Sequence, residues 1–256
     1  MLSHNLKIAL PTTDELPCSD DTPVDNEDQN FLPNVLLFLL SAIWAERMDW
    51  FFGVDMALYH TTGVNPKVPV VPDGFLSVGV ERKKGGKSRK SYAVWEENEV
   101  VPILTLEMVS QTPGGEYDDK LAIYTKLGVL YYVIYNPEYW RRDQHQPLEV
   151  YKLVDGNYRL QIGEPYWMPE VGLGIGRYQG MIGGISQELL SWYDNTGNRY
   201  LTSDEQVQLE RNRAEQERNR AEQERTRAEI ERTRAEHLAQ YLRSLGIDPN
   251  NLPSDS

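Results

Sequence analysis

Three residues have the types and spacing needed for metal-assisted hydrolysis of a phosphodiester. Asp73 ends the segment Val71-Pro72-Asp73, Glu107 follows it by 34 residues, and Lys120 ends Glu116-Tyr117-Asp118-Asp119-Lys120. Both carboxylates stand at the ends of short apolar runs, where strands would deliver them to one edge of a sheet as oxygen ligands for Mg²⁺. Lys120 would supply a nearby positive charge, and no other set of residues suggests chemistry.

The proposed chemistry explains why these residue types belong together. Hydrolysis requires a water activated near neutral pH and neutralisation of the charge that grows on the phosphate, and Mg²⁺ (or Mn²⁺) supplies both. Asp73, Glu107 and the main-chain carbonyl after Glu107 would suffice as ligands. Taken alone, each acid has a structural reading, because Pro-Asp often opens a turn and a Glu often ends a strand. Glu46, near the end of an expected helix, is a possible additional acid.

A basic loop is the candidate contact for a DNA backbone. Six of the 26 Lys and Arg residues of the chain lie within nine positions around Gly85-Gly86, a density that suits phosphate binding. These residues are Arg82, Lys83, Lys84, Lys87, Arg89 and Lys90. The alternative, a solvated hairpin tip that discourages aggregation, stays open.

Length and composition limit the class of protein. The 256 residues have room for one ordinary domain and an extension. The single cysteine, Cys18, excludes an intramolecular disulfide and Cys-based zinc sites. A net charge of -13 argues against a generally basic nucleic-acid binder. No secretory signal opens the chain and the apolar run 35–45 is too short to span a bilayer, so we expect a cytoplasmic protein with no membrane contact.

The apolar pattern predicts an α/β (α+β) fold with a mixed central sheet flanked by helices. A buried helix is expected from Pro33 to about Trp50, and a crossover helix from Glu116 to Leu127. The expected strands are 54–59, 68–80, 91–95, 102–109 and 130–136, followed by a hairpin of 148–153 and 158–162. The expected regions are a flexible acidic leader (1–30), the α/β domain (31–200), a charged heptad-repeat helix (201–246) and a flexible tail (247–256).

The register of the crossover helix concerns Lys120. Lys120, Ile123, Tyr124 and Leu127 recur at helical spacing on one face, so the lysine shares the stripe that should pack on the sheet. A lysine there either snorkels from the first turn to water or faces the carboxylates. The presence of Asp73 and Glu107 favours the second reading.

Two other segments carry repeats. The glycine pattern of residues 172–177 lacks the third glycine of a dinucleotide-binding motif, and we expect it to be a loop. From Glu210 the chain repeats every seven residues with opposite charges three or four apart, which predicts a self-supporting helix. Its repeating apolar position is Ala, too little for a strong coiled coil, so we expect a solvated arm or a weak homo-oligomer contact.

The segments VPD73, LTLE107MVS, EYDDK120LAIY and LYYVIYNP resemble the Uma-two family of restriction endonucleases, of the cyanobacterial type, within the PD-(D/E)XK superfamily. The resemblance covers roughly residues 30–195 and extends to the tail. It implies a restriction-endonuclease-like fold with Asp73 and Glu107 as metal ligands. The family's lysine slot, two residues after Glu107, is occupied by Val109, and Lys120 is the natural substitute.

Two functional hypotheses follow. The first is a Mg²⁺-dependent DNA endonuclease with Asp73, Glu107 and Lys120 at its centre. The second is a catalytically inactive nuclease-fold module that binds protein or nucleic acid through its charged helix, with Val109 marking lost chemistry. Convergence of the three side chains in the fold is the observation that separates an assembled site from scattered residues.

Overall fold

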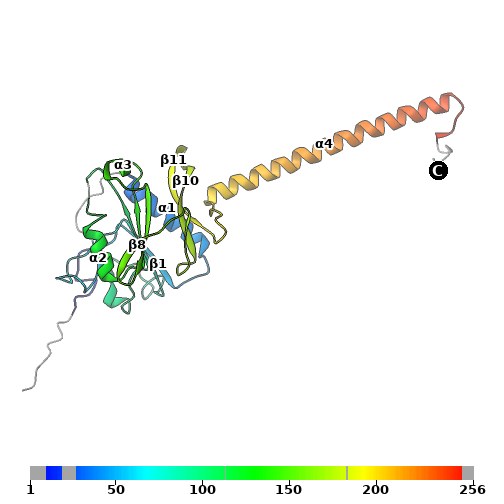
Figure 1. Cartoon of the computed structure of the whole chain (residues 1–256). Helices are drawn as coiled ribbons and strands as arrows, with labels where there is room; N and C mark the ends of the chain where they lie inside the picture. Colours follow the sequence, from blue (N-terminus) through cyan, green and yellow to red (C-terminus); the bar gives the residue numbers. More distant parts are fainter. Residues whose placement is uncertain (1–9, 19–26, 113, 183, 250–256) are drawn as a thin grey trace, which may run out of the picture. The chain divides into compact units, whose positions relative to one another are not determined.

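The computed structural model describes residues 10–18, 27–112, 114–182 and 184–249. The chain divides into two units, Met1–Tyr200 and Leu201–Ser256. The first unit contains a mixed α/β fold, as the sequence predicts (Figure 1). The second contains the long charged helix.

A six-stranded mixed sheet forms the centre of the first unit. Its strands, in spatial order, are β1 (Trp50–Val54), β3 (Gly74–Val78), β5 (Leu104–Met108), β6 (Tyr131–Tyr135), β7 (Leu148–Val154) and β8 (Asn157–Leu160). Only the β5 and β6 pair is parallel, and the other neighbours are antiparallel. Helix α2 (Asp119–Leu127) makes the crossover that a parallel pair requires. The carboxyl ends of β5 and β6 therefore lie at the same end of the sheet.

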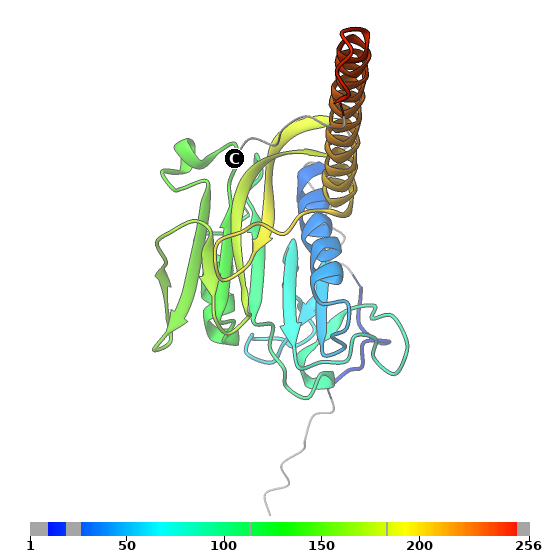
Figure 2. The same ribbon diagram turned by 90° about the vertical axis from the view of Figure 1, so that its right-hand side faces the viewer.

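Alternation along β5 assigns its side chains to two separate cores. Leu106 and Met108 join the core formed with helix α1 (Glu27–Ile43), whereas Val109 joins the core that contains Tyr124 and Leu127 of α2. Glu107, between Leu106 and Met108, therefore points to the face that α2 covers. The face toward α1 is also covered by a second sheet, of β9 (Tyr166–Met168), β10 (Leu173–Ile182) and β11 (Ile185–Tyr193). Figures 1 and 2 show α1 beside the strands, with α2 on the other side.

Several boundaries differ from the sequence expectation. Helix α1 begins at Glu27 and ends at Ile43, and Pro33 lies inside it. The chain then turns so that Trp50 starts β1, with its indole Nε1 donating to the carbonyl of Arg47. The expected strand 91–95 is short: β4 (Tyr92–Ala93) pairs with β2 (Leu58–Tyr59) and leads into a 3₁₀ turn, Val94–Glu96.

The glycine-rich segment is a strand, and the expectation of a loop there was wrong. It forms the start of β10, where Gly174 pairs with Trp167 on one side and with Tyr193 on the other. A Cβ added to Gly176 would lie 2.9 Å from the Cβ of Pro165, so glycine permits this close approach. The glycines therefore serve strand packing.

Part of the leader also differs from expectation. Residues 1–9 and 19–26 lie outside the described residues, but 10–18 pack against the domain. Leu16 is buried with Ala57 and Tyr59, and the Trp95 indole donates to the carbonyl of Pro11. This stretch is therefore more ordered than its composition suggests, because Leu16 and two backbone acceptors, the carbonyls of Pro11 and Pro17, find partners far along the chain.

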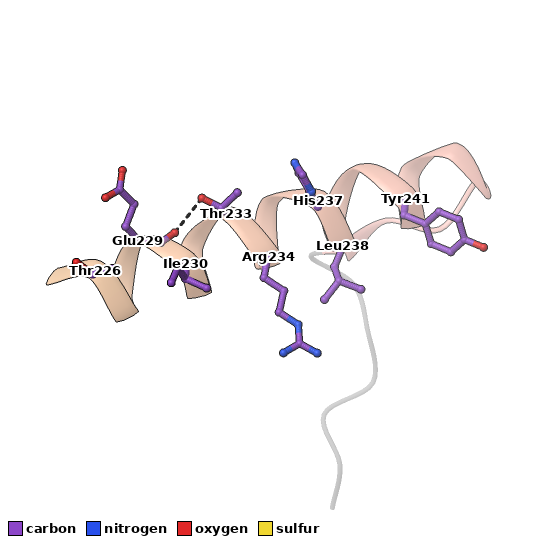
Figure 3. A pocket seen from close by; sticks show the side chains of 8 residues that line it. All are labelled: Thr226, Glu229, Ile230, Thr233, Arg234, His237, Leu238 and Tyr241. Atoms are coloured by element: carbon purple, nitrogen blue, oxygen red, sulfur yellow. Dashed lines mark hydrogen bonds between the residues drawn. The ribbon is translucent and has the colours of Figure 1, made fainter. Parts of the chain in front are cut away.

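Helix α4 (Ser203–Ser244) makes up most of the second unit. Thr202 and Glu205 form a reciprocal capping box at its start, and none of its residues is buried. A shallow concavity runs along one of its faces near the carboxyl end, where Ile230, Leu238 and Tyr241 are exposed (Figure 3). All its lining residues come from this one helix, which cannot enclose a substrate. Among the residues that the structure describes, no helix has the length and apolar character to cross a membrane.

Candidate active site at the end of the central sheet

Sheet topology brings Asp73 and Glu107 together. Gly74, the first residue of β3, pairs with Leu106 of β5, so Asp73 lies beside the end of β5 that carries Glu107. The Asp73 carboxylate crosses between the strands, and its Oδ2 accepts a hydrogen bond from the backbone N–H of Met108 at 2.6 Å. Strand pairing and the hydrogen bond from the Met108 backbone to the Asp73 side chain thus hold the two acids at one end of the sheet.

Helix α2 adds a lysine and a tyrosine to this pair. Lys120 Nζ donates to Glu107 Oε2 at 2.7 Å, and the Tyr124 hydroxyl donates to Glu107 Oε1 at 2.5 Å. Glu107 is fully buried, whereas the Lys120 side chain stays 24% exposed and so keeps a route to solvent. Both oxygens of Glu107 are oriented by one face of one helix.

The electrostatics of the site are unbalanced. Burial, followed by the Glu107 charge, raises the pKa of Asp73 well above its ordinary value, against the opposing effects of the Met108 amide and Lys120. Burial also raises the pKa of Glu107 in spite of Lys120 and Tyr124. Burial alone would lower the pKa of Lys120, but the carboxylates of Glu107, Asp73 and Glu116 together outweigh it and the net direction is up. The two carboxylates of Asp73 and Glu107 therefore have one positively charged partner, the Lys120 ammonium group.

The donor set fits a small divalent cation. Mg²⁺ prefers oxygen ligands and is held by one or two carboxylates together with waters and substrate phosphate. A cation between Asp73 and Glu107 would relieve the repulsion that raises the pKa of Asp73. Within the described part of the chain no group of three His, Cys, Asp or Glu residues could hold a metal, so a site built only from protein ligands, as for zinc, does not fit.

Apolar packing beneath α2 explains how Lys120 comes to lie beside Glu107. Val109 is buried and packs with Tyr124 and Ile134 beneath α2. The apolar contact seats α2 on the sheet, and Lys120 approaches Glu107 from that helix. Sequence reasoning placed Lys120 on the correct face but missed the hydroxyl of Tyr124 as a partner of Glu107. The sequence did contain a signal for this contact: Tyr124 lies four residues after Lys120 and so shares its helix face.

Glu46 does not join the site, and this expectation was wrong. It is exposed in the turn that precedes β1. Because β1 and β3 are antiparallel, Trp50 at the start of β1 pairs with Val78, whereas Val54 at its end pairs with Gly74. Asp73 and Glu46 therefore lie at opposite ends of a five-residue strand, which separates them by roughly 15 Å.

The basic loop leaves β3 at that same opposite end. Arg89 is wrong as a phosphate contact: its side chain is 2% exposed, forms two hydrogen bonds with Glu97 and lies over the Phe51 ring. Arg82 stacks on the Trp50 ring, Lys84 pairs with Glu96 and Glu97, and Lys90 pairs with Asp14. Lys83 and Lys87 are the exposed members with no salt bridge to a described residue. The loop is therefore not placed to hold a phosphate at Asp73 and Glu107.

One family model matches this chain. The model of the Uma2 family, described as “Putative restriction endonuclease”, matches residues 22–178, more than half of the chain. A crystal structure described as “a putative nuclease belonging to DUF820”, from Anabaena variabilis ATCC 29413, is 12% identical with a TM-score of 0.42, over 62% of this chain and 89% of that chain. A search of curated proteins found no match.

Proposed function

Since this chain belongs to the Uma2 family, we propose that it is a metal-dependent DNA endonuclease that hydrolyses phosphodiester bonds at Asp73, Glu107 and Lys120. The observation that carries the proposal is the convergence of these side chains at one end of the sheet, with two carboxylates and one lysine. A buried surplus of negative charge is unfavourable for folding alone and suits a site that binds a cation.

Each residue has a separate task in this proposal. Asp73 and Glu107 would hold Mg²⁺ or Mn²⁺, which would supply an activated water and stabilise the developing charge. Lys120 donates from Nζ to oxygen atoms that gain negative charge in the transition state. Tyr124 holds one oxygen of Glu107 and thereby fixes the direction of the other. The carboxylates, once neutralised by the cation, no longer repel the substrate phosphate.

Plasmid nicking tests the proposal. Purified protein is incubated with supercoiled DNA in Mg²⁺, in Mn²⁺ and in a chelator, and nicking is expected only with metal. Lys120→Ala should lose nicking, whereas Lys126→Ala, at an exposed lysine on the same helix, should retain it. Full nicking by Lys120→Ala would remove the lysine from the mechanism.

Calorimetric titration of Mg²⁺ or Mn²⁺ tests the metal site separately. The double variant Asp73→Ala, Glu107→Ala should lose binding. A double variant at the exposed acids Asp118 and Asp119, changed to Asn, is the matched control because it removes the same charge next to Lys120. Unchanged affinity in the first variant would contradict the site.

A second candidate is the inactive nuclease-fold module, and Val109 is the observation that favours it. An apolar residue occupies the strand position of the usual lysine and packs into a core. If the wild-type protein never nicks DNA in Mg²⁺ or Mn²⁺, and folded protein binds neither metal, the scaffold serves binding alone.

A further inference from the structure

A second polar cluster lies at the same end of the sheet as Glu107. Strand β6 ends at Tyr135, and the chain then forms α3 (Trp140–Asp143) before it returns as β7. We call residues 136–146 the α3 turn. Because β5 and β6 are parallel, the α3 turn begins at the sheet end where Glu107 is located. Figure 1 shows α3 beyond one end of the strands.

Strand register places one carboxylate of this cluster on the face of the active site. Glu107 pairs with Ile134, and Ile134 pairs with Glu149. Directly paired residues point to the same face of a sheet, so Glu107 and Glu149 share a face two strands apart, or about 10 Å between backbones. Glu149 is buried.

Glu149 holds the ring of His145 in a defined orientation. The Glu149 oxygens accept hydrogen bonds from the backbone N–H of Gln146 at 3.0 Å and from the Tyr151 hydroxyl at 2.6 Å. His145 Nδ1 lies 3.1 Å from Glu149 Oε1. A carboxylate only accepts hydrogen bonds, so Nδ1 carries the proton. Nε2 is then the ring nitrogen available to a ligand, and it forms no hydrogen bond with any residue that the structure describes. When Nε2 is protonated as well, it donates to an acceptor such as a phosphate oxygen.

The ring is also fixed to the segment that carries Lys120. Tyr117 stacks on His145 with ring centroids 3.6 Å apart and planes 7° from parallel. The Tyr117 hydroxyl accepts from Asn136 Nδ2 at 3.1 Å, and Asn136 also holds Asp143. Tyr117 precedes Lys120 by three residues, so one short stretch contacts both Glu107 and His145. The imidazole is rigid, yet its side chain remains 33% exposed.

Two arginines and two acids lie on the α3 turn with this histidine, and of the arginines Arg142 pairs with Asp143. Arg141 is exposed and lies over the Trp140 ring at 4.7 Å. Arg142 bonds the Gln111 carbonyl and Asp143, which anchors the turn to the strand-end loop after β5. An exposed arginine over an aromatic ring, on the same turn as an oriented histidine, is suited to contact a nucleic-acid backbone.

We propose that His145, oriented by Glu149 and Tyr117, binds a phosphate of the substrate strand next to the phosphate at Glu107, and that Arg141 contacts the same strand. The α3 turn is then the nucleic-acid-binding surface of the site, in place of the basic loop at the other end of the sheet. This inference rests on the proposed nuclease function, because it takes the substrate to be a nucleic acid.

Binding in a chelator tests the inference without cleavage. Fluorescence anisotropy of a labelled DNA duplex gives Kd for the wild type, His145→Phe and Arg141→Gln. Phe keeps the stack on Tyr117 and removes both ring nitrogens, so folding should be retained, as a thermal melt checks. We expect each variant to bind about tenfold more weakly, the effect of one lost phosphate contact.

Two controls distinguish binding from structure. Lys83→Gln with Lys87→Gln removes two exposed charges from the basic loop and should weaken binding less than Arg141→Gln alone. Tyr151→Phe removes another hydrogen bond of Glu149 and leaves the imidazole, so it should bind as the wild type does. Wild-type affinity in His145→Phe, or equal weakening in Tyr151→Phe, overturns the inference.

The nicking assay separates this inference from the function on which it rests. Wild-type nicking with unchanged Kd in His145→Phe overturns the phosphate contact and leaves the nuclease intact. Binding that depends on His145 without any nicking supports the surface and contradicts the nuclease. Wild-type protein that does not bind DNA overturns the inference directly.

Discussion

Two buried glutamates at opposite ends of the central sheet each contact a basic side chain, yet their surroundings differ. Glu97 pairs with Arg89 through two hydrogen bonds, and Arg89 also donates to the carbonyl of Glu81. Lys84 adds a second positive charge there. Glu107 pairs with Lys120, but Asp73 adds a second negative charge. The first pair is charge-compensated, and the second is not.

The contrast teaches how to separate a structural ion pair from a site. A bidentate arginine satisfies a buried carboxylate in both charge and geometry, and nothing is left for a ligand. A lysine is a point charge on a flexible stem, and with two acids beside it the local charge stays negative. Burial alone does not identify function; the residual charge after pairing does.

The largest expected effect on stability comes from breaking the compensated pair. Arg89→Ala leaves Glu97 buried with only Lys84, so the free energy of unfolding should fall by about 3 to 5 kcal/mol. Chemical denaturation measures it. Metal affinity of the folded fraction should stay at the wild-type value. A loss below about 1 kcal/mol would erase the distinction between the two pairs.

Next in size is the effect of Lys120 on activity. Lys120→Ala should reduce the nicking rate by at least about 100-fold, as for loss of one group that stabilises the transition state. Lys120→Arg keeps the charge and should lose less. Stability should fall less than in Arg89→Ala, because Lys120 is partly exposed and Glu107 keeps Tyr124. Equal nicking rates for the Ala and Arg variants would show that the charge has no role.

A smaller effect concerns Asp73 and pH. Its pKa is raised in the folded protein, so the folded state binds this proton more tightly than the unfolded state does. That contribution to stability is complete below the ordinary value of 3.8 and is lost as pH rises through the higher folded value. In a chelator at pH 8, Asp73→Asn should therefore be more stable than the wild type by on the order of 1 kcal/mol.

The same variant provides the control. The difference between Asp73→Asn and the wild type should shrink toward pH 4, where both carry a neutral side chain at this position. Mg²⁺ at pH 8 should raise the Tm of the wild type and leave that of Asp73→Asn unchanged. A wild type more stable than the variant at pH 8 without metal would mean that the acid pair is compensated after all.

The smallest expected effect belongs to Lys84. It is 38% exposed and shares its acids with Arg89 and Thr13. Lys84→Ala should lower the free energy of unfolding by no more than about 1 kcal/mol, the usual value for a solvated ion pair. If Lys84→Ala lowered the free energy of unfolding as much as Arg89→Ala does, Lys84 and not Arg89 would be the residue that stabilises the buried Glu97.

The sequence was informative where the signal was local. Apolar runs located β5, β6 and the hairpin, and helical spacing placed Lys120 on the stripe with Tyr124 and Leu127, as the structure has it. These features depend on neighbours within one element. The mixed sheet itself followed from the same runs.

What the sequence did not reveal depends on contacts between distant segments. Arg89 and Lys87 both belong to one basic run with no local signal of burial, and only the fold brings Glu97 and Phe51 to Arg89. The packing of Leu16 similarly requires Ala57 and Tyr59 to be in place. Glu46 was misplaced because the direction of β1 relative to β3 decides which end of the sheet it occupies.

The seven-residue repeat of α4 has a consequence for alignment with another helix. Ala214, Ala221, Ala228 and Ala235 recur among nearly identical charges, so a partner displaced by one repeat, about 10.5 Å, would meet the same surface. Such a surface specifies no register by itself. Ile230, Leu238 and Tyr241 interrupt this equivalence close to the carboxyl end of α4. Val207 and Leu209 do the same near its start. Any helix that aligns uniquely on α4 must therefore take its alignment from side chains such as these, which the repeat does not contain at every turn.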